Sequence, residues 1–403
     1  MNGVKHSLAN LCIKITDGSH NPPKGIDYSE HIMLSSKNVL DDCIHLDKPR
    51  YLSEEDFQKE NNRTDVNPGD VLLTIVGTVG RVAVVDNSLP KFTLQRSVAV
   101  LKPNEERVSS RFLMYSLQAI LEELLGEARG VAQKGIYLRT LRAMEIYIPA
   151  HPEQKRIVAI LDKAFAEIEQ ARANTEQNLK NARELFESYL QQVFSQRGEE
   201  WQTFRLLEVV KLKSGTTIKK DFEKDSGDVA YIKVAGMTLA GNEVGITTSE
   251  KFLDNKNIRT SNILPIGTTI FPKRGGAIGT NKKRITQIPL CVDLNIMGAI
   301  PDTSKVLPMF IFNFFKTFDL LSISNGTTIP QINNYSFDSL EISLPNLEEQ
   351  ETLVDRISNL EKEYFALAEL YNKKLEAIHE LKKSLLQKAF SGELTKIDKG
   401  VAA

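Results

Sequence analysis

The chain contains one internal repeat, and this repeat constrains the architecture more than any other feature of the sequence. Matching segments occur in the same order in both halves, roughly 196 to 199 residues apart. They are residues 8–11 with 207–210, 77–80 with 276–279, 148–154 with 344–350, and 190–195 with 386–391. One structural unit is therefore used twice.

Each copy combines a strand-rich segment with a long polar segment free of helix breakers, which predicts an α+β chain with a pseudo-twofold repeat. The apolar runs at 70–76 and 81–85 flank the first glycine turn and predict a hairpin. We expect a mixed domain at 1–150, a helix at 151–198, a second domain at 199–346, a second helix at 347–392 and a flexible tail at 393–403.

Both long segments carry a heptad pattern. In the first, apolar residues recur at alternating spacings of four and three, which is typical of a coiled coil. The predicted seam is Ile157, Leu161, Ala164, Ile168, Ala171, Thr175, Asn178, Ala182, Leu185 and Tyr189, and the second seam is the same pattern from Leu353 to Leu385. Small residues of the first seam would face bulky ones of the second, so we predict an antiparallel pair within one chain. Asn178 and Lys374 would specify its register.

Two other arrangements are compatible with the same pattern: helices exposed along one face, or two separate homodimeric coiled coils. A helix of about 43 residues is roughly 65 Å long, which is too long to pack inside either domain. The complementary sizes of the two seams favour pairing within the chain.

Charge is balanced overall and unbalanced locally. The chain has 51 Lys and Arg against 52 Asp and Glu, so its overall charge gives no evidence for a polyanion partner. Residues 255–292, however, contain seven basic and no acidic side chains, and residues 71–104 contain four basic side chains against Asp86 alone. Both copies therefore place a positive patch around their glycine turn, where backbone amides and cations can approach phosphate oxygens. An ordinary solvated turn is the alternative interpretation.

Signatures of metal sites, disulfide frameworks and catalysis are missing from the sequence. Cys12, Cys43 and Cys291 are far apart and form no CxxC pattern, which fits a reducing cytoplasm. Residues 21–24 resemble the Asn-Pro-Pro-aromatic motif of amino-methyltransferases, but Lys24 replaces the aromatic residue. The glycines at 275–279 lack the Gly-Lys-Ser/Thr ending of a nucleotide-binding loop. We therefore expect a cytoplasmic protein that is not an enzyme and holds no cofactor or metal.

Taken in order along the chain, these motifs resemble the specificity subunit of a type I restriction-modification system. The resemblance covers about residues 7–391. It rests on the duplication, on residues 16–22, on the Pro and Glu-Gln residues that precede each helix, and on the helix ends at 193–195 and 389–394. The second copy departs from the pattern, because Ser214, Gly215 and Thr216 lack the Asp and His of the first.

The resemblance implies two target recognition domains that each read half of an asymmetric, bipartite DNA site, and a coiled coil that sets their spacing. It also implies two methyltransferase (modification) subunits docked on the chain, and restriction/translocase subunits that complete the nuclease. S-adenosylmethionine, ATP and magnesium would be used by these partners. A non-catalytic coiled-coil adaptor and a stand-alone DNA-modifying enzyme are the alternative functions.

If the chain is such a specificity subunit, Arg and Gln side chains would contact base edges and lysines would position the DNA backbone. The DNA-binding candidates in the first copy are Ser19, His20, Arg81, Arg96 and Lys134. Those in the second copy are Thr216, Lys219, Lys273, Arg274, Lys282, Lys283, Arg284 and Gln331.

Overall fold

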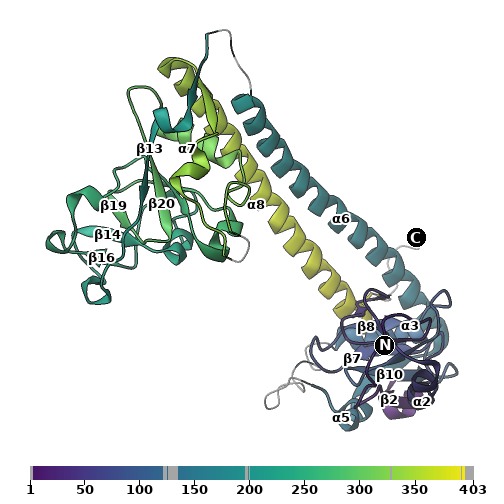
Figure 1. Cartoon of the computed structure of the whole chain (residues 1–403). Helices are drawn as coiled ribbons and strands as arrows, with labels where there is room; N and C mark the ends of the chain where they lie inside the picture. The colour runs from purple at the N-terminus through teal and green to yellow at the C-terminus, as the bar shows by residue number, and fades with distance from the viewer. Residues whose placement is uncertain are drawn as a thin grey trace, which may run out of the picture. The chain divides into compact units, whose positions relative to one another are not determined.

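The computed structural model describes residues 3–120, 125, 135–195, 198, 200–326, 329–391 and 393–394. These residues form two compact units (Figure 1). Unit 1 is Met1–Thr175 with Lys373–Ala403, and unit 2 is Glu176–Asn372. Each unit contains one domain and one end of each long helix. The candidate Lys134 and the tail residues 395–403 lie outside the described residues.

The domain of unit 1 is built on a four-stranded antiparallel sheet in the order β2-β10-β7-β8. A second sheet has the order β6-β3-β9, with β3 and β9 parallel. The elements are β1 (Gly3–Ser7), α1 (Leu8–Leu11), β2 (Cys12–Asp17), β3 (Ile32–Leu34), β4 (Val39–Leu40), β5 (Cys43–Ile44), β6 (Arg50–Tyr51), α2 (Glu54–Thr64), β7 (Val71–Thr74), β8 (Val82–Val84), β9 (Phe92–Leu94), β10 (Val98–Pro103), α3 (Ser110–Ala119), α5 (Leu138–Ala143) and β11 (Glu145–Pro149).

The domain of unit 2 repeats this arrangement. Its main sheet has the order β13-β20-β17-β18-β15, and its second sheet has the order β16-β14-β19, with β14 and β19 parallel. The elements are β12 (Gln202–Arg205), β13 (Val210–Ser214), β14 (Val229–Ile232), β15 (Gly245–Ile246), β16 (Phe252–Leu253), β17 (Thr269–Pro272), the 3-10 helix η6 (Gly275–Thr280), β18 (Arg284–Thr286), β19 (Leu290–Val292), β20 (Ile296–Pro301), α7 (Pro308–Lys316) and β21 (Glu341–Leu344). The predicted duplication and the predicted hairpin β7–β8 are confirmed.

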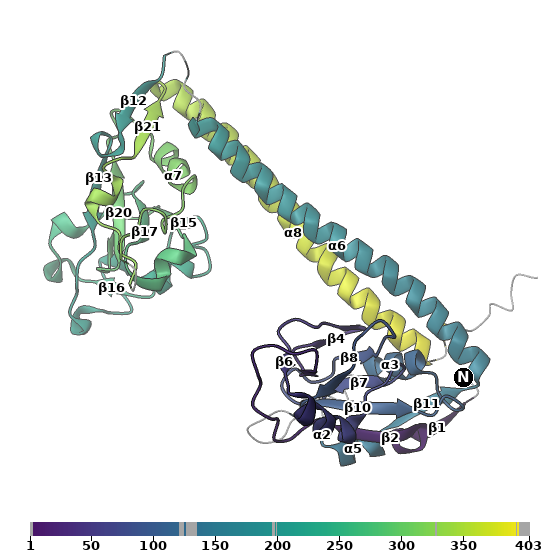
Figure 2. The ribbon, with the colours of Figure 1, turned by 45° about the vertical axis from the view of Figure 1, so that its right-hand side comes forward.

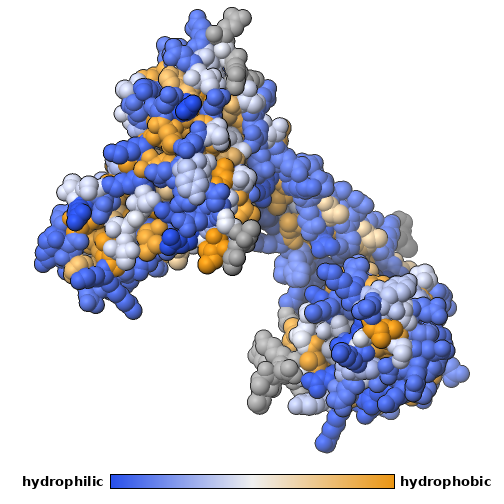
Figure 3. Space-filling view, in the orientation of Figure 1, coloured by the Kyte–Doolittle hydropathy of each residue, from blue (hydrophilic) through white to orange (hydrophobic). Residues whose placement is uncertain are grey.

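One helix packs on the main sheet in each unit, α3 in unit 1 and α7 in unit 2, because both are amphipathic. In α7, Pro308 occupies the first turn, where its missing N–H costs no hydrogen bond. Phe315 of α7 stacks on Phe271 of β17 with ring centroids 5.4 Å apart. Both rings are fully buried, and burial of such side chains is the main contribution to core stability. Hydrophilic side chains cover most of the visible surface of both units, with apolar areas on unit 2 (Figure 3).

The long helices are α6 (His151–Ser195) and α8 (Leu347–Ser391), 45 residues each. Their segments lie side by side in each unit (Figure 2). In unit 1, Phe165 and Ile168 of α6 share a core with Leu386 of α8. In unit 2, Phe186 of α6 stacks on Tyr364 of α8, with ring centroids 5.7 Å apart. Early residues of one helix thus meet late residues of the other, which confirms the predicted antiparallel pairing within one chain.

The predicted seam is correct at many positions and wrong at others. Tyr189, Leu353, Ile357, Leu360 and Tyr364 pack together in unit 2, and Ile168, Ile378 and Leu385 share the core of unit 1. Asn178 and Lys374 are exposed, so neither lies in a seam or specifies register. Leu185 is 68% exposed, whereas the next residue, Phe186, is buried. At this turn Phe186, and not Leu185, faces α8, where it stacks on Tyr364. The polar seam residue Thr175 is buried, and its Oγ1 donates to the Ala171 carbonyl at 2.7 Å.

Candidate nucleic-acid interface

Sheet topology gathers the predicted DNA-binding loops at one end of each main sheet. In unit 1, β10 is antiparallel to both β2 and β7, so the loop before β10 lies beside the loops that follow β2 and β7. We call residues 17–20, 75–81 and 95–97 the loop rim of unit 1. In unit 2, residues 214–219, 273–283 and 293–295 have the same relation to β13, β17 and β20. These residues form the loop rim of unit 2 together with 329–333, where Gln331 is bridged to Arg274.

The first loop of each rim is held by a close backbone crossing. Ser19 N donates to the Leu94 carbonyl at 2.7 Å, and Thr216 N donates to the Val292 carbonyl at 3.0 Å. A Cβ on the preceding glycine, Gly18, would lie 2.1 Å from Leu94 O, and a Cβ on Gly215 would lie 2.0 Å from Asp293 O. Only glycine allows this approach. The motif that the two copies share at this point therefore has a structural cause.

An ion-pair cluster occupies the first loop of unit 1. The Asp17 carboxylate, 8% exposed, accepts a hydrogen bond from Arg63 Nη2 at 2.5 Å and contacts His20 Nε2 at 2.8 Å. Arg63 Nε also donates to the Asp17 carbonyl at 2.8 Å. The imidazole of His20 is 55% exposed at the rim, and its Nδ1 has no hydrogen-bond partner among the described residues. The cluster fixes one edge of the ring and leaves the other edge for a ligand.

The remaining unit 1 candidates take different positions. Ser19 is buried, so its side chain is not presented to a partner, and its contribution is the backbone crossing. Arg96 is exposed and donates its backbone N–H to the Ser19 carbonyl at 2.9 Å. Arg81 is half-buried at the end of the glycine turn, where its N–H donates to Thr74 Oγ1 at 2.9 Å.

The loop rim of unit 2 brings together most of the second set of candidates. Lys273 Nζ donates to Ser214 Oγ at 2.8 Å. Burial, together with the neighbouring Arg274, lowers the pKa of Lys273 below its usual range. Arg274 is exposed and forms an antiparallel bridge with Gln331. Thr216 is half-buried at the crossing and Lys219 is exposed. The side-chain amide of Gln331 donates to Asn333 Oδ1 at 3.0 Å.

Two of the DNA-binding candidates, Lys283 and Arg284, form hydrogen bonds within unit 2, contrary to the sequence prediction. Lys283 is 6% exposed, and its ammonium donates to Asn281 Oδ1 at 2.7 Å and to the Phe318 carbonyl at 2.6 Å. Burial lowers the pKa of Lys283 to about 8. Arg284 donates from Nε to the Asn242 carbonyl at 2.5 Å, and from Nη1 to the Lys283 carbonyl at 2.8 Å. Both cations satisfy backbone carbonyls inside unit 2, so we remove them from the DNA-binding set.

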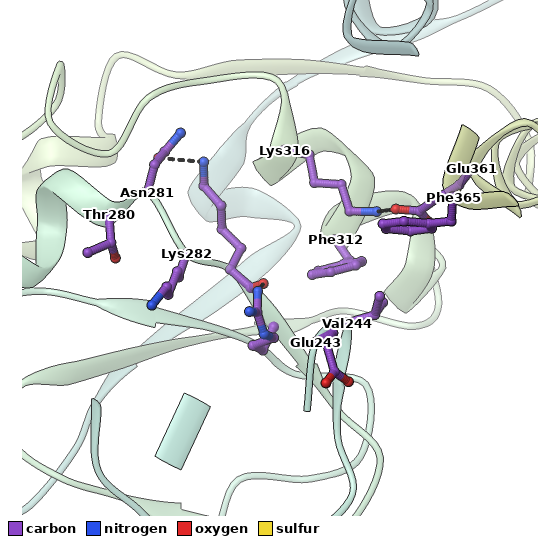
Figure 4. Close-up of a pocket in the computed structure, with 11 residues that line it drawn as sticks. Glu243, Val244, Thr280, Asn281, Lys282, Phe312, Lys316, Glu361 and Phe365 are labelled. Carbon is purple, nitrogen blue, oxygen red and sulfur yellow. Dashed lines mark hydrogen bonds and ion pairs between the residues drawn. The ribbon is translucent and has the colours of Figure 1, made fainter. Parts of the chain in front are cut away.

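Lys282, which is half-buried, borders a hollow of about 270 Å³ in unit 2 (Figure 4). The opposite wall carries the ion pair of Lys316 with Glu361, in which Nζ and Oε1 are 2.7 Å apart. Lys316 Nζ also lies 4.5 Å from the ring centroid of Phe312. This pair links α7 to α8. In unit 1, Arg111 of α3 links to Asp162 of α6 in a similar way, with Nε 2.9 Å from Oδ1.

Sequence reasoning did not select Arg63 or Tyr335. Arg63 lies on α2, 46 residues from Asp17, and nothing local indicates their contact. Tyr335 is 61% exposed, and its hydroxyl accepts a hydrogen bond from Asn333 Nδ2 at 3.0 Å. A tyrosine four residues after Gln331 was a sequence signal for a further side chain at the loop rim.

Within the part of the chain that the structure describes, no group of three or more His, Cys, Asp or Glu side chains is arranged to hold a metal ion. Nor does any described helix have the length and apolar character needed to cross a membrane.

Comparison with known proteins decides what kind of molecule carries these rims. Residues 44–177 and 198–377 match the family model of the type I restriction modification DNA specificity domain. The chain belongs to this family. The putative type I restriction enzyme MjaX specificity subunit of Methanocaldococcus jannaschii is 22% identical over 386 residues, which cover 89% of this chain and 86% of that protein.

Solved structures show the same fold for this specificity subunit. A chain in a structure that describes the complex assembly and conformational transition of a type I R-M system aligns with a TM-score of 0.79 and 16% identity, over 97% of this chain and 98% of that one. The HsdS subunit from Thermoanaerobacter tengcongensis aligns with a TM-score of 0.57 and 15% identity, over 97% of both chains. The α+β prediction, with two strand-rich domains and two long helices, is confirmed.

Family membership also selects among the functions considered from the sequence. A specificity subunit recognises DNA sequence and is not itself an enzyme. The stand-alone DNA-modifying enzyme and the purely structural adaptor are therefore excluded. Which rim residues contact DNA remains a prediction.

Proposed function

We propose that each domain reads one half of an asymmetric, bipartite DNA target through its loop rim. The observation that carries this proposal is a shared backbone framework with different side chains at equivalent places. After β2, which ends at Asp17, unit 1 presents the imidazole of His20, held by Asp17. In unit 2, Ser214 takes the place of Asp17 and accepts a hydrogen bond from Lys273 Nζ, and the exposed Thr217 takes the place of His20. Different donors and acceptors on one framework recognise different bases.

Within each rim, the exposed cations divide between base contacts and phosphate contacts. Arg274 is the base-reading candidate of unit 2, because a guanidinium can donate two parallel hydrogen bonds to guanine O6 and N7. Lys219 and Lys282 position the DNA backbone. In unit 1, His20 and Arg96 are the exposed candidates, with Arg81 beside the glycine turn.

The two long helices set the distance between the half-sites and carry the partner subunits. A helix of 45 residues is about 67 Å long. Both helices expose apolar side chains that a docked methyltransferase subunit would cover: Leu185 is 68% exposed, Leu370 61% and Leu381 50%. Two methyltransferase subunits dock there in the cytoplasm, and restriction/translocase subunits complete the nuclease. The partners, and not this chain, use S-adenosylmethionine, ATP and magnesium.

The decisive experiment is to produce the chain with its methyltransferase partner in a methylation-free bacterial host and to map adenine methylation over the genome. We expect one motif with two different half-sites separated by a fixed spacer, and methylation of one adenine on each strand. A variant with substituted side chains in the loop rim of unit 2 should change the base sequence of one methylated half-site and leave the sequence of the other unchanged. Methylation at a continuous or symmetric motif would contradict the proposal.

A further inference from the structure

The backbone conformation requires the glycines in the glycine turn of unit 1, but it does not require all of those in the glycine turn of unit 2. In unit 1, Gly77 and Gly80 have positive φ angles of 81° and 99°, which L-residues rarely adopt. In η6 of unit 2, only Gly275 has a positive φ, 73°. A Cβ on Gly276 or Gly279 would meet no atom within 4 Å, and neither residue has a φ in the left-handed region. The fold of unit 2 therefore requires no glycine at 276 or 279.

Flexibility does not explain these two glycines either, because the turn is fixed on both sides. Ile278, between them, is fully buried in the core of unit 2. Asn281 ends the turn in the left-handed conformation, and its N–H donates to the Ile278 carbonyl at 2.9 Å. Its Oδ1 accepts hydrogen bonds from Leu320 N at 2.9 Å and from Lys283 Nζ at 2.7 Å. At the other end, Gly275 N donates to the Pro330 carbonyl at 2.8 Å.

The surroundings of the turn are suited to an anionic partner. Arg274 precedes the turn and is exposed, and Lys282 follows it. The whole stretch 255–292 lacks Asp and Glu. The face of the turn formed by Gly276 and Gly279 has no side chains and lies between two cations. A partner can approach the backbone more closely at glycine than at any other residue type.

We infer that the face of η6 formed by Gly276 and Gly279 packs directly against the sugar–phosphate backbone of the second half-site. This inference rests on the proposed function of unit 2 as a DNA-reading domain. The missing Cβ atoms make room for the DNA strand, and Arg274 and Lys282 flank the same contact. Alanine at either position would add a methyl group between protein and DNA and hold the strand away.

The test uses the full chain in complex with its methyltransferase and a duplex that carries the mapped target. Gly276→Ala, Gly279→Ala and the double variant are compared with the wild type in melting temperature, DNA affinity and the salt dependence of that affinity. We expect no lower melting temperature, at least a fivefold rise in Kd, and a shallower salt dependence, because fewer phosphates are neutralised. Gly275→Ala is the contrasting variant, and it should lower the melting temperature because of its positive φ.

Three results would overturn the inference: a rise in Kd of less than fivefold, a fall in melting temperature that accompanies the loss of affinity, or a loss of affinity with unchanged salt dependence. The wild-type complex separates this inference from the proposed function. If the wild type fails to prefer the mapped duplex over a scrambled one, the proposed function fails. If the wild type prefers it and the alanine variants behave like the wild type, only the role of the two glycines fails.

Discussion

Gln154 and Gln350 make the same set of hydrogen bonds at the start of the two long helices. Each side chain is fully buried. Each amide nitrogen donates to two backbone carbonyls, and each Oε1 accepts one backbone N–H, at distances from 2.9 to 3.1 Å. The partners are Arg107, Pro149 and Ser109 for Gln154, and Lys305, Pro345 and Leu307 for Gln350. Each glutamine thereby fastens a long helix to the loop that precedes α3 or α7.

Gln154→Leu and Gln350→Leu should each lower the free energy of unfolding by about 2–4 kcal/mol, because three buried backbone groups lose their partners. Urea unfolding followed by circular dichroism measures the loss. Gln177→Leu, at an exposed position of α6, is the control and should change stability little. Losses equal to that of the control would show that the buried amides are dispensable.

Lys283 should make the stability of unit 2 depend on alkaline pH. Its pKa is about 8 in the folded chain, against an ordinary 10.5. Between these values the unfolded chain binds more protons, so the free energy of unfolding rises with pH. The contribution of Lys283 should grow by about 2 kcal/mol from pH 8 to pH 10.

The measurement is the difference in unfolding free energy between the wild type and Lys283→Met at these two pH values. Taking the difference removes the titration of all other groups. Lys219→Met, at an exposed lysine, serves as the control variant. A wild-type minus Lys283→Met difference that is the same at pH 8 and pH 10 would refute the prediction.

The ion pair of Lys316 with Glu361 is largely buried, with side chains 18% and 15% exposed. Removing one partner leaves an uncompensated charge, so Lys316→Met or Glu361→Gln alone should cost about 2–3 kcal/mol. The double variant should be less destabilised than the sum of the two. A double-mutant cycle in urea tests this, and the exposed pair of Lys251 with Asp225 should show no measurable coupling. Additive losses would contradict a direct interaction.

His20→Ala should weaken binding to the target by about 1–3 kcal/mol if Nδ1 of the ring contacts a base. The effect should appear only on duplexes with an intact first half-site. Asp17→Asn, which retains the shape of the cluster and removes its charge, should produce a smaller loss of the same kind. Fluorescence anisotropy on duplexes altered in one half-site measures both, with the exposed His379→Ala as the control. Equal losses on all duplexes would assign His20 to a phosphate.

Arg274→Ala should weaken binding to the mapped target by about 1–3 kcal/mol and relax the preference at one position of the second half-site. Arg259 lies in the same basic stretch, is exposed and is outside the loop rim, so Arg259→Ala is the matched control. Competition binding with duplexes substituted at single positions provides the measurement. The same loss on target and random DNA would make Arg274 a phosphate contact.

Local patterns in the sequence were sufficient to predict the duplication, the hairpin at the first glycine turn and the antiparallel helix pair. These features depend on periodicity and on residues close together in the chain. The heptad template was right for many seam residues and failed at Asn178 and Leu185, which are exposed. It selects positions by spacing alone and does not include the side chains that the partner helix presents, such as Tyr364, on which Phe186 stacks.

The reading surface was only partly predictable, since burial depends on contacts between distant segments. Lys283 and Arg284 look like surface cations in a basic stretch. Their positions are explained by carbonyls at Phe318 and Asn242, which come from other parts of unit 2. Arg63 was missed for the same reason, because it lies on α2 and its partner Asp17 lies on β2, 46 residues away.

The crossings at Gly18 and Gly215 have an evolutionary consequence. Their hydrogen bonds run between backbone atoms, so the side chains at positions 20 and 217 can change without removing these contacts. A single substitution there can change which base is preferred without disturbing folding. A substitution at either glycine would disrupt the domain without creating a new preference. New DNA targets can therefore arise through single substitutions in the rim loops, while Gly18 and Gly215 stay unchanged.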